Sequence, residues 1–335
     1  MSLDTANRSF WAIVALAATP FLVLGALGCG VLSLTAYRIA TGGPSVLGDG
    51  PAAVAATVFL VASVLGAALV VRSLARQARA TTVLTRRLRG HQTTAPARLR
   101  AIASDAGIDQ VRLVDDPDAY SLTVGLLNPV VHISTALVDR SSDTELAAVL
   151  AHERYHVANH DPLKIAFARA LTAGLFLLPA ARHLLDRYLV GRELGADRRA
   201  LRRCGRPALA GALLQSAGGP VLPQPGAAAA FGGDHLLEVR ITQLEADTEP
   251  DLPALSGTAV ASTVAGMVAM TVGLVATVFA ADVPTVFDSP SGGLDLAGAV
   301  MCVAMWIFVG LAVRNRHRRP AGGLTRTNPL RTTGA

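Results

Sequence analysis

The sequence predicts a membrane protein that is mainly α-helical, with about four transmembrane helices and a cytoplasmic α+β domain that contains a small sheet. Two observations predict the membrane part: apolar residues make up 51% of the 335 residues and charged residues only 16%, and the mean hydropathy is +0.44. A third observation predicts the sheet, because short β-like runs occur in the middle of the chain. Ordinary soluble domains of this length are less apolar, so we expect membrane-spanning segments.

Four uncharged runs are long enough to cross a bilayer, which requires roughly 20 apolar residues. They are Phe10–Tyr37, Ala52–Val71, Leu255–Ala281 and, at the lower limit of length, Leu296–Val313. The first run is much longer than the apolar core of a secretory signal, which has roughly 7 to 15 residues. We therefore interpret it as an uncleaved anchor.

Arginine sets the expected topology. Residues 72–100 contain eight arginines and no acidic residue, and such a segment stays in the cytoplasm by the positive-inside rule. More arginines follow the last apolar run. We therefore predict a multi-pass protein of the cell inner (plasma) membrane, in contact with the lipid bilayer, with its central domain and both termini in the cytoplasm. The arginines adjoin a membrane run without any recognition motif, so the sequence does not favour nucleic acid as a partner.

The predicted chain has three parts. Residues 1–94 hold an N-terminal pair of transmembrane helices and the basic cytoplasmic segment. Residues 95–251 form the central cytoplasmic domain. Residues 252–335 hold the C-terminal pair of transmembrane helices and a basic tail.

Three short β-like runs, separated by turn signals such as Asp-Asp-Pro-Asp, predict the small sheet. They are Val111–Val114, Ser121–Val124 and Val130–Ser134. If the last run lies at an edge of the sheet, an extended peptide can pair with it by β-augmentation. The residues of that candidate strand are Val130, Val131, His132, Ile133 and Ser134. Pairing of this strand on both sides within the protein is the open alternative.

An H-E-x-x-H pattern occupies residues 152–156, on a helix that a capping box at residues 142–145 predicts to begin there. His152 and His156 are four residues apart, so they project from one face of the helix and can share one metal ion. Glu153 lies between them and can act as a general base toward a zinc-bound water. Two solvent-facing histidines are the alternative, but an apolar stripe beside them indicates a buried helix, in which unpaired polar groups are costly. The pattern predicts a Zn²⁺ site.

A zinc ion with an open catalytic position needs a third protein ligand. His160 lies two helical turns from His152, roughly 12 Å by helical rise, which is too far to share the ion. Glu193 is another candidate, and Asp197 lies on the same helical face, where it can accept a hydrogen bond from a zinc-bound histidine. Solvated ion pairs with neighbouring arginines are the simpler reading of Glu193, so spacing alone does not assign the third ligand.

Four motifs in order resemble one family. Residues 147–163 read A-A-V-L-A-H-E-R-Y-H-V-A-N-H-D-P-L and resemble the H-E-L-x-H-x-x-x-x-D-x-L signature of BlaR/MecR-type membrane metallopeptidases. R-E-L-G-A-D at residues 192–197 is similar to that family's R-E-L-x-x-D. The segment at residues 125–131 resembles its G-x-x-x-P-x-I, and residues 240–244 resemble its R-I-x-x-L. HtpX-like peptidases resemble this family in their arrangement of zinc ligands.

The resemblance implies a zincin-like domain and a zinc-dependent endopeptidase. It assigns His152, His156 and Glu193 as zinc ligands and Glu153 as the catalytic base. Asp197 and Asp161 are the carboxylates that support the ligands. The implied substrate is a cytoplasmic or membrane-associated protein or peptide, and a repressor is among the candidates. The implied role is in signalling or regulated proteolysis. Val130–Ser134 is the candidate strand for binding the substrate. The alternatives are an HtpX-like quality-control protease and, in another class, a catalytically silent membrane signalling or scaffold protein. The partner of the oxyanion stays open among Tyr120, His183 and Arg198.

Pro162 should end the zinc helix. The apolar segment that follows, Ile165–Ala181, cannot be a single crossing, because His156 and Glu193 flank it and must meet at one ion. We expect a helix that packs beside the zinc helix or dips into the inner leaflet.

Overall fold

The computed structural model describes residues 6–18, 51–216, 229–231, 234–246, 252 and 255–280. The chain divides into two compact units, residues 1–22 with 54–263 and residues 23–53 with 264–335. The described elements are α2 (Pro51–Gly90), β1 (Gln92–Thr93), α3 (Ala97–Asp105), β2 (Val111–Val114), β3 (Ser121–Val124), β4 (Val130–Ser134), α4 (Thr135–Arg140), α5 (Asp143–Asn159), α6 (Asp161–Gly174), α7 (Pro179–Cys204), α8 (Arg206–Ser216), β5 (Ala229–Phe231), α9 (Asp234–Ala246) and α10 (Gly257–Ala280). The sheet and the helices that follow it up to α9 all belong to the first unit.

The strands form one mixed sheet in the order β1-β2-β4-β3-β5. β2 and β4 are parallel, and the other neighbours are antiparallel. β2, β3 and β4 have the bounds that the sequence predicts. However, β4 pairs on both sides, with β2 and with β3, so the open alternative of internal pairing holds and Val130–Ser134 is not an open edge for a substrate peptide. After β2 the chain forms β3 two positions away in the sheet. β4 then fills the place between β2 and β3 and is therefore an inner strand.

α5 begins at the predicted capping box. The Ser142 hydroxyl accepts a hydrogen bond from the Glu145 N–H, and the Glu145 carboxylate accepts one from the Ser142 N–H at 2.8 Å. The helix ends at Asn159 because His160 has a left-handed backbone conformation, with φ of 52°. Pro162 then lies in the first turn of α6, where its missing N–H has no helical partner to lose.

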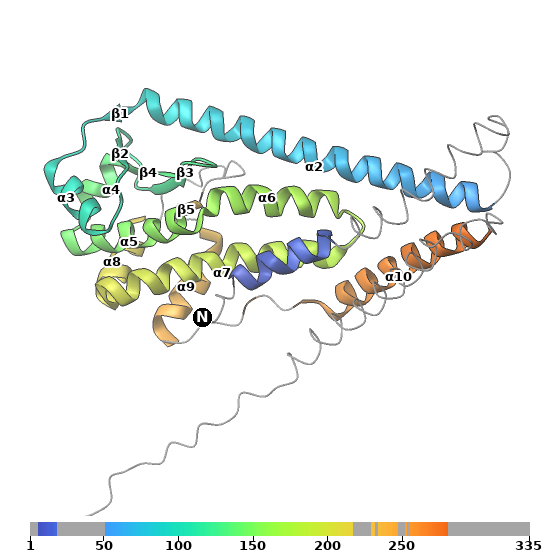
Figure 1. The fold of residues 1–335 in the computed structure, drawn as a ribbon. Helices are drawn as coiled ribbons and strands as arrows, with labels where there is room; N and C mark the ends of the chain where they lie inside the picture. Colours follow the sequence, from blue (N-terminus) through green and yellow to red (C-terminus); the bar gives the residue numbers. More distant parts are fainter. Residues whose placement is uncertain are drawn as a thin grey trace, which may run out of the picture. The chain divides into compact units, whose positions relative to one another are not determined.

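α6 and α7 form a helical hairpin. α6 ends at Gly174, the chain turns, and α7 begins at Pro179, which also lies in a first helical turn. The two helices pack side by side, and α7 also packs along α5 (Figure 1). The segment Ile165–Ala181 therefore contains the turn of this hairpin, and the returning helix can bring its residues to α5.

The apolar core surrounds α5. One face of this helix packs on α3, α8 and the sheet, and another face packs on α7. Fully buried core side chains from these elements include Leu99, Val131, Ile133, Leu146, Leu150 and Leu209. Burial of α5 on both faces means that any polar side chain on it needs a partner inside the protein.

A helical segment over residues 6–18 packs on the hairpin. The backbone of Ala6 lies against Gly191, where an added Cβ would approach Ala6 atoms to 3.3 Å. The Phe10 and Tyr188 rings are 5.5 Å apart between centroids. The start of the predicted run Phe10–Tyr37 therefore contacts the helices that carry the site.

The prediction of about four transmembrane helices is contradicted. Within the residues that the structure describes, no helix is both long enough and apolar enough to cross a membrane. The run Ala52–Val71 does not end as a separate apolar span, because α2 continues as one helix through the arginine-rich stretch to Gly90. Leu296–Val313 and the end of the first run, after residue 18, lie outside the described residues. The predicted topology and multi-pass location rested on these spans, and the described helices do not support them.

Core packing around α5 yields a stability prediction. Leu150→Ala removes a fully buried side chain and should lower the free energy of unfolding by about 2–5 kcal/mol, since it loses apolar burial and leaves a cavity. Leu127→Ala is the matched control, because Leu127 is 73% exposed and its truncation should change stability by less than about 0.5 kcal/mol. Chemical denaturation of the full chain measures both. Equal stability of the two variants would contradict the position of α5 in the core.

Candidate metal centre

α5 and α7 bring three potential metal ligands together. His152 and His156 come from successive turns of α5, and Glu193 comes from α7. Each side chain offers a ligand atom, and these atoms all lie within 4.8 Å of one another. The two histidines are fully buried and Glu193 is 3% exposed. This is the three-ligand group expected from the sequence, and no residue of it is open to bulk water.

The distances between the ligand atoms fit one shared ion. The Nε2 atoms of His152 and His156 are 3.1 Å apart. The Glu193 carboxylate oxygens lie 3.5 Å from Nε2 of His152 and 3.8 Å from Nε2 of His156. Neighbouring ligands of a tetrahedral zinc ion with bonds near 2.0–2.1 Å are separated by about 3.3 Å. Neither Glu193 oxygen has a hydrogen-bond partner, so both keep lone pairs for a cation.

Two aspartates fix the orientation of the histidine rings. Nδ1 of His152 lies 2.8 Å from Asp197 Oδ1, and Nδ1 of His156 lies 2.6 Å from Asp161 Oδ2. A carboxylate only accepts, so each Nδ1 carries the proton and donates it. Both Nε2 atoms are then unprotonated and present their lone pairs to the same point, as metal ligands must. Asp197 and Asp161, the two carboxylates proposed from the sequence, thus contact the two histidines.

Arg240 extends this arrangement from α9. Its Nε and Nη2 donate to the two oxygens of Asp197, each at 2.6 Å, and its side chain is fully enclosed. Burial alone raises the pKa of Asp197, but the charge and hydrogen bonds of Arg240 together with those of His152 lower it below its usual value. Asp197 therefore stays charged while it holds the His152 ring. The sequence contained a signal for this residue, since Arg240 begins the R-I-x-x-L motif, but its role required the fold.

Glu153 faces the sheet and does not belong to the ligand group. Its Oε1 accepts a hydrogen bond from Ser121 Oγ at 2.6 Å, and its Oε2 accepts one from Thr123 Oγ1 at 2.5 Å. All three side chains are fully buried. Ser121 and Thr123 are alternate residues of β3, so their side chains leave the same face of the strand. The sequence analysis missed both, and their spacing in the strand before the zinc helix was the available signal.

The surroundings favour a positive charge at the ligand group. Burial lowers the pKa of His152, but the carboxylates of Asp197 and Glu193 raise it above its usual value. Burial raises the pKa of Glu193, but the positive charge of Arg192 and the neighbouring histidines lower it well below its usual range. Arg192 Nη2 lies 3.0 Å from Glu193 Oε1. Glu193 is therefore an anion at neutral pH.

Other expected site residues lie in the sheet or directly next to it. His132 is buried in β4, which lowers its pKa to about 4, so it is neutral at physiological pH. The Tyr120 hydroxyl donates to Asp116 at 3.0 Å, and its ring packs in a small apolar cluster with Leu122. These contacts do not identify an oxyanion partner.

Two histidines from one helix, a glutamate from a second helix and a carboxylate between the histidines define a protein of the metallopeptidase type. The comparison of sequences agrees, and the chain belongs to the BlaR1 peptidase M56 family, which it matches over residues 49–244. The resemblance drawn from the four motifs is thereby confirmed. The matched region contains the buried group of two histidines and one glutamate.

Individual relatives match a shorter region. "Protease HtpX" of Thioalkalivibrio sulfidiphilus is 33% identical over 102 residues, which are 29% of this chain and 35% of that protein. "Protease HtpX homolog" of Nitrosomonas europaea is 34% identical over 102 residues, with the same coverage. "Plastoglobule-localized metallopeptidase 48, chloroplastic" of Arabidopsis thaliana is 34% identical over 99 residues, 30% of this chain and 29% of that protein. The chain thus spans about a third of the length of these curated relatives.

Glu153 lies apart from the three residues that could hold a metal ion, so substitutions should distinguish them. His152→Ala, His156→Ala and Glu193→Ala should each lose the bound metal, because each removes one of three ligand side chains. Glu153→Ala should keep the metal, since both of its oxygens bond to β3 instead. Metal analysis of the four purified variants by mass spectrometry measures this. Full occupancy in Glu193→Ala would remove Glu193 from the ligand set.

Proposed function

We propose that the protein is a zinc-dependent endopeptidase, with His152, His156 and Glu193 as zinc ligands and Glu153 as the general base. The observation that carries this proposal is the buried group of two histidine Nε2 atoms and two Glu193 oxygens without a hydrogen bond, all within reach of one ion. Histidine nitrogen and carboxylate oxygen ligands, three in number with a fourth position left open, are the donor set of catalytic zinc. Two histidines of an H-E-x-x-H helix with one glutamate are the ligands of zinc in metalloproteases.

When bound, zinc lowers the pKa of a coordinated water and polarises the substrate carbonyl. The protein's own groups do the remaining work. Glu153 takes a proton from the attacking water at one carboxylate oxygen and later delivers it to the leaving amine. The hydroxyls of Ser121 and Thr123 hold the two oxygens of that carboxylate in place, and they can stay hydrogen-bonded to it as its charge changes. Asp197 and Asp161 keep the histidine tautomers fixed throughout.

Protein or peptide is the proposed substrate class. A repressor protein is the specific candidate that the family resemblance implies, and cleavage of such a protein would place the enzyme in regulated proteolysis. An HtpX-like quality-control protease is the second candidate, favoured by the relatives named Protease HtpX. A catalytically silent signalling or scaffold protein fits less well, because the base and all three ligands are present and packed together.

A single substitution tests the catalytic role. Glu153→Gln keeps the size and the burial of the side chain but cannot take a proton, so cleavage of casein by the purified full chain should fall by about 10²- to 10⁴-fold. Zinc content should stay unchanged. Glu245→Gln is the matched control, because Glu245 is exposed on α9 and its replacement should leave cleavage unchanged. Wild-type cleavage by Glu153→Gln would exclude Glu153 as the base, and absence of cleavage by the wild type itself would favour the scaffold reading.

A further inference from the structure

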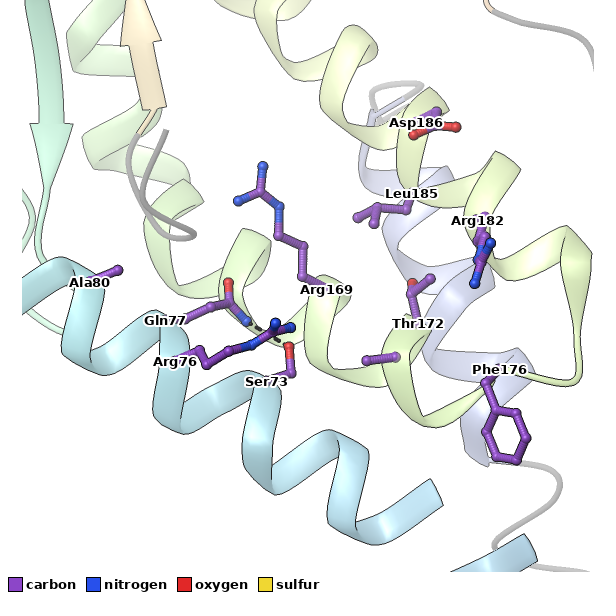
Figure 2. Close-up of a pocket in the computed structure, with 11 residues that line it drawn as sticks. Ser73, Arg76, Gln77, Ala80, Arg169, Thr172, Phe176, Arg182, Leu185 and Asp186 are labelled. Atoms are coloured by element: carbon purple, nitrogen blue, oxygen red, sulfur yellow. Dashed lines mark hydrogen bonds between the residues drawn. The ribbon is translucent and has the colours of Figure 1, made fainter. Parts of the chain in front are cut away.

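A pocket separate from the metal ligands lies where α2, α6 and α7 meet, within the first compact unit. Its volume is about 600 Å³, within the usual range of small-molecule sites. Figure 2 shows that its lining side chains come from all three helices, with Arg169 extending from α6 and Gln77 from α2. The lining includes three arginines and one acidic residue: Arg76, Arg169, Arg182 and Asp186. The net charge of the pocket is therefore positive.

The rim of the pocket is basic and accessible. Arg76 and Arg182 are exposed, and in the described part of the chain no ion pair engages either guanidinium. Arg169 is more enclosed, and burial together with the charge of Arg192 lowers its pKa. Three guanidiniums and a single carboxylate line the cavity, so a bound anion would offset its excess of positive charge. Guanidinium groups match the oxygens of phosphate particularly well because they donate two parallel hydrogen bonds.

The floor of the pocket is polar and incompletely hydrogen-bonded. Gln77 Nε2 donates to the Ala166 carbonyl at 2.9 Å and to Ser73 Oγ at 3.3 Å, which fixes the amide orientation. Gln77 Oε1 and Thr172 Oγ1 are buried and have no partner. Unpaired buried polar atoms are costly, so a bound molecule that supplies the missing bonds would be stabilised here. Because Gln77 Oε1 only accepts, the molecule that satisfies it must carry a donor such as a hydroxyl.

The pocket also interacts with the metal centre through the charges of two arginines. Arg169 lies close enough to Arg192 for their charges to interact, and Arg192 contacts the ligand Glu193. The charge of an anion beside Arg169 would therefore also act on Arg192. The interaction between the two arginines therefore links the pocket to the metal centre, whether or not the ligand of the pocket is a peptide.

We propose that this pocket binds a phosphate-containing anion that also carries a hydroxyl group, with the arginines on the phosphate oxygens and the hydroxyl on Gln77 Oε1. Thr172 contributes its hydroxyl to the same ligand. Two sources offer this chemistry, a soluble phosphate ester and the headgroup of an anionic glycerophospholipid. The proposal does not rest on the peptidase function, since none of the zinc ligands lines the pocket.

Calorimetric titration of the full chain with glycerol 3-phosphate tests the proposal, at constant ionic strength because surface charge effects are screened by salt. We expect saturable binding with a Kd of about 1 mM or tighter. Arg182→Ala and Arg76→Ala should each weaken binding about tenfold, since each removes a charge-assisted hydrogen bond. Thr172→Val keeps the shape of the floor and should weaken binding by roughly threefold or more.

Arg79→Ala is the matched control, because Arg79 is an exposed arginine of α2 that does not line the pocket. It should bind like the wild type, and the zinc content and circular dichroism of every variant should match the wild type. An equal loss in Arg79→Ala would overturn the proposal, as would absence of saturable binding up to about 10 mM combined with absence of the vesicle preference described below. Wild-type affinity in both Arg182→Ala and Thr172→Val would also overturn it.

Vesicles distinguish the two sources. If the ligand is a lipid headgroup, the chain should bind vesicles of phosphatidylglycerol better than vesicles of phosphatidylcholine, and Arg182→Ala should remove that preference. If the ligand is a soluble ester, glycerol 3-phosphate should bind while the vesicle preference is absent or insensitive to Arg182→Ala. Either result supports a phosphate site, and loss of both responses in the wild type contradicts it.

Discussion

The packing of α5 against α7 encloses an excess of negative charge, and the rest of the site depends on how that charge is balanced. Among the residues that the structure describes, four buried carboxylates and two buried guanidiniums lie in or around the ligand group: Glu153, Asp161, Glu193 and Asp197, with Arg192 and Arg240. With neutral histidines, two negative charges remain uncompensated. Isolated buried charges are strongly unfavourable, and one divalent cation restores neutrality. The aspartates that orient the histidines and the arginine that holds Asp197 are therefore parts of one charge-balanced unit.

Local patterns in the sequence predicted much of this unit. The capping box, the H-E-x-x-H spacing and the strand boundaries each depend on residues within a few positions of one another, and the structure has the capping box and strands where they were expected. The third ligand was different, because spacing alone could not separate Glu193 from a solvated ion pair. Only the R-E-L-x-x-D resemblance pointed to Glu193, and only the hairpin of α6 and α7 explains how it reaches α5.

Long-range features were beyond the sequence. Ser121 and Thr123 contact Glu153 across about thirty residues, and Arg240 reaches Asp197 from a separate helix. The position of β4 inside the sheet depends on strand order, which the pattern of one strand does not encode. The apolar runs misled in another way, because length and hydropathy do not reveal that α2 continues through the arginines as one helix. Composition indicated a class of protein that the described helices do not support.

X-ray absorption at the zinc edge tests the central claim most directly, because it reports the ligands of the bound ion. The full chain loaded with zinc should give a first shell of nitrogen and oxygen only, at about 2.0–2.2 Å, with the multiple-scattering signature of two imidazoles. A sulfur shell at about 2.3 Å, from any of the three cysteines, would contradict the account. A spectrum without imidazole would contradict it equally, because His152 and His156 would then not hold the metal.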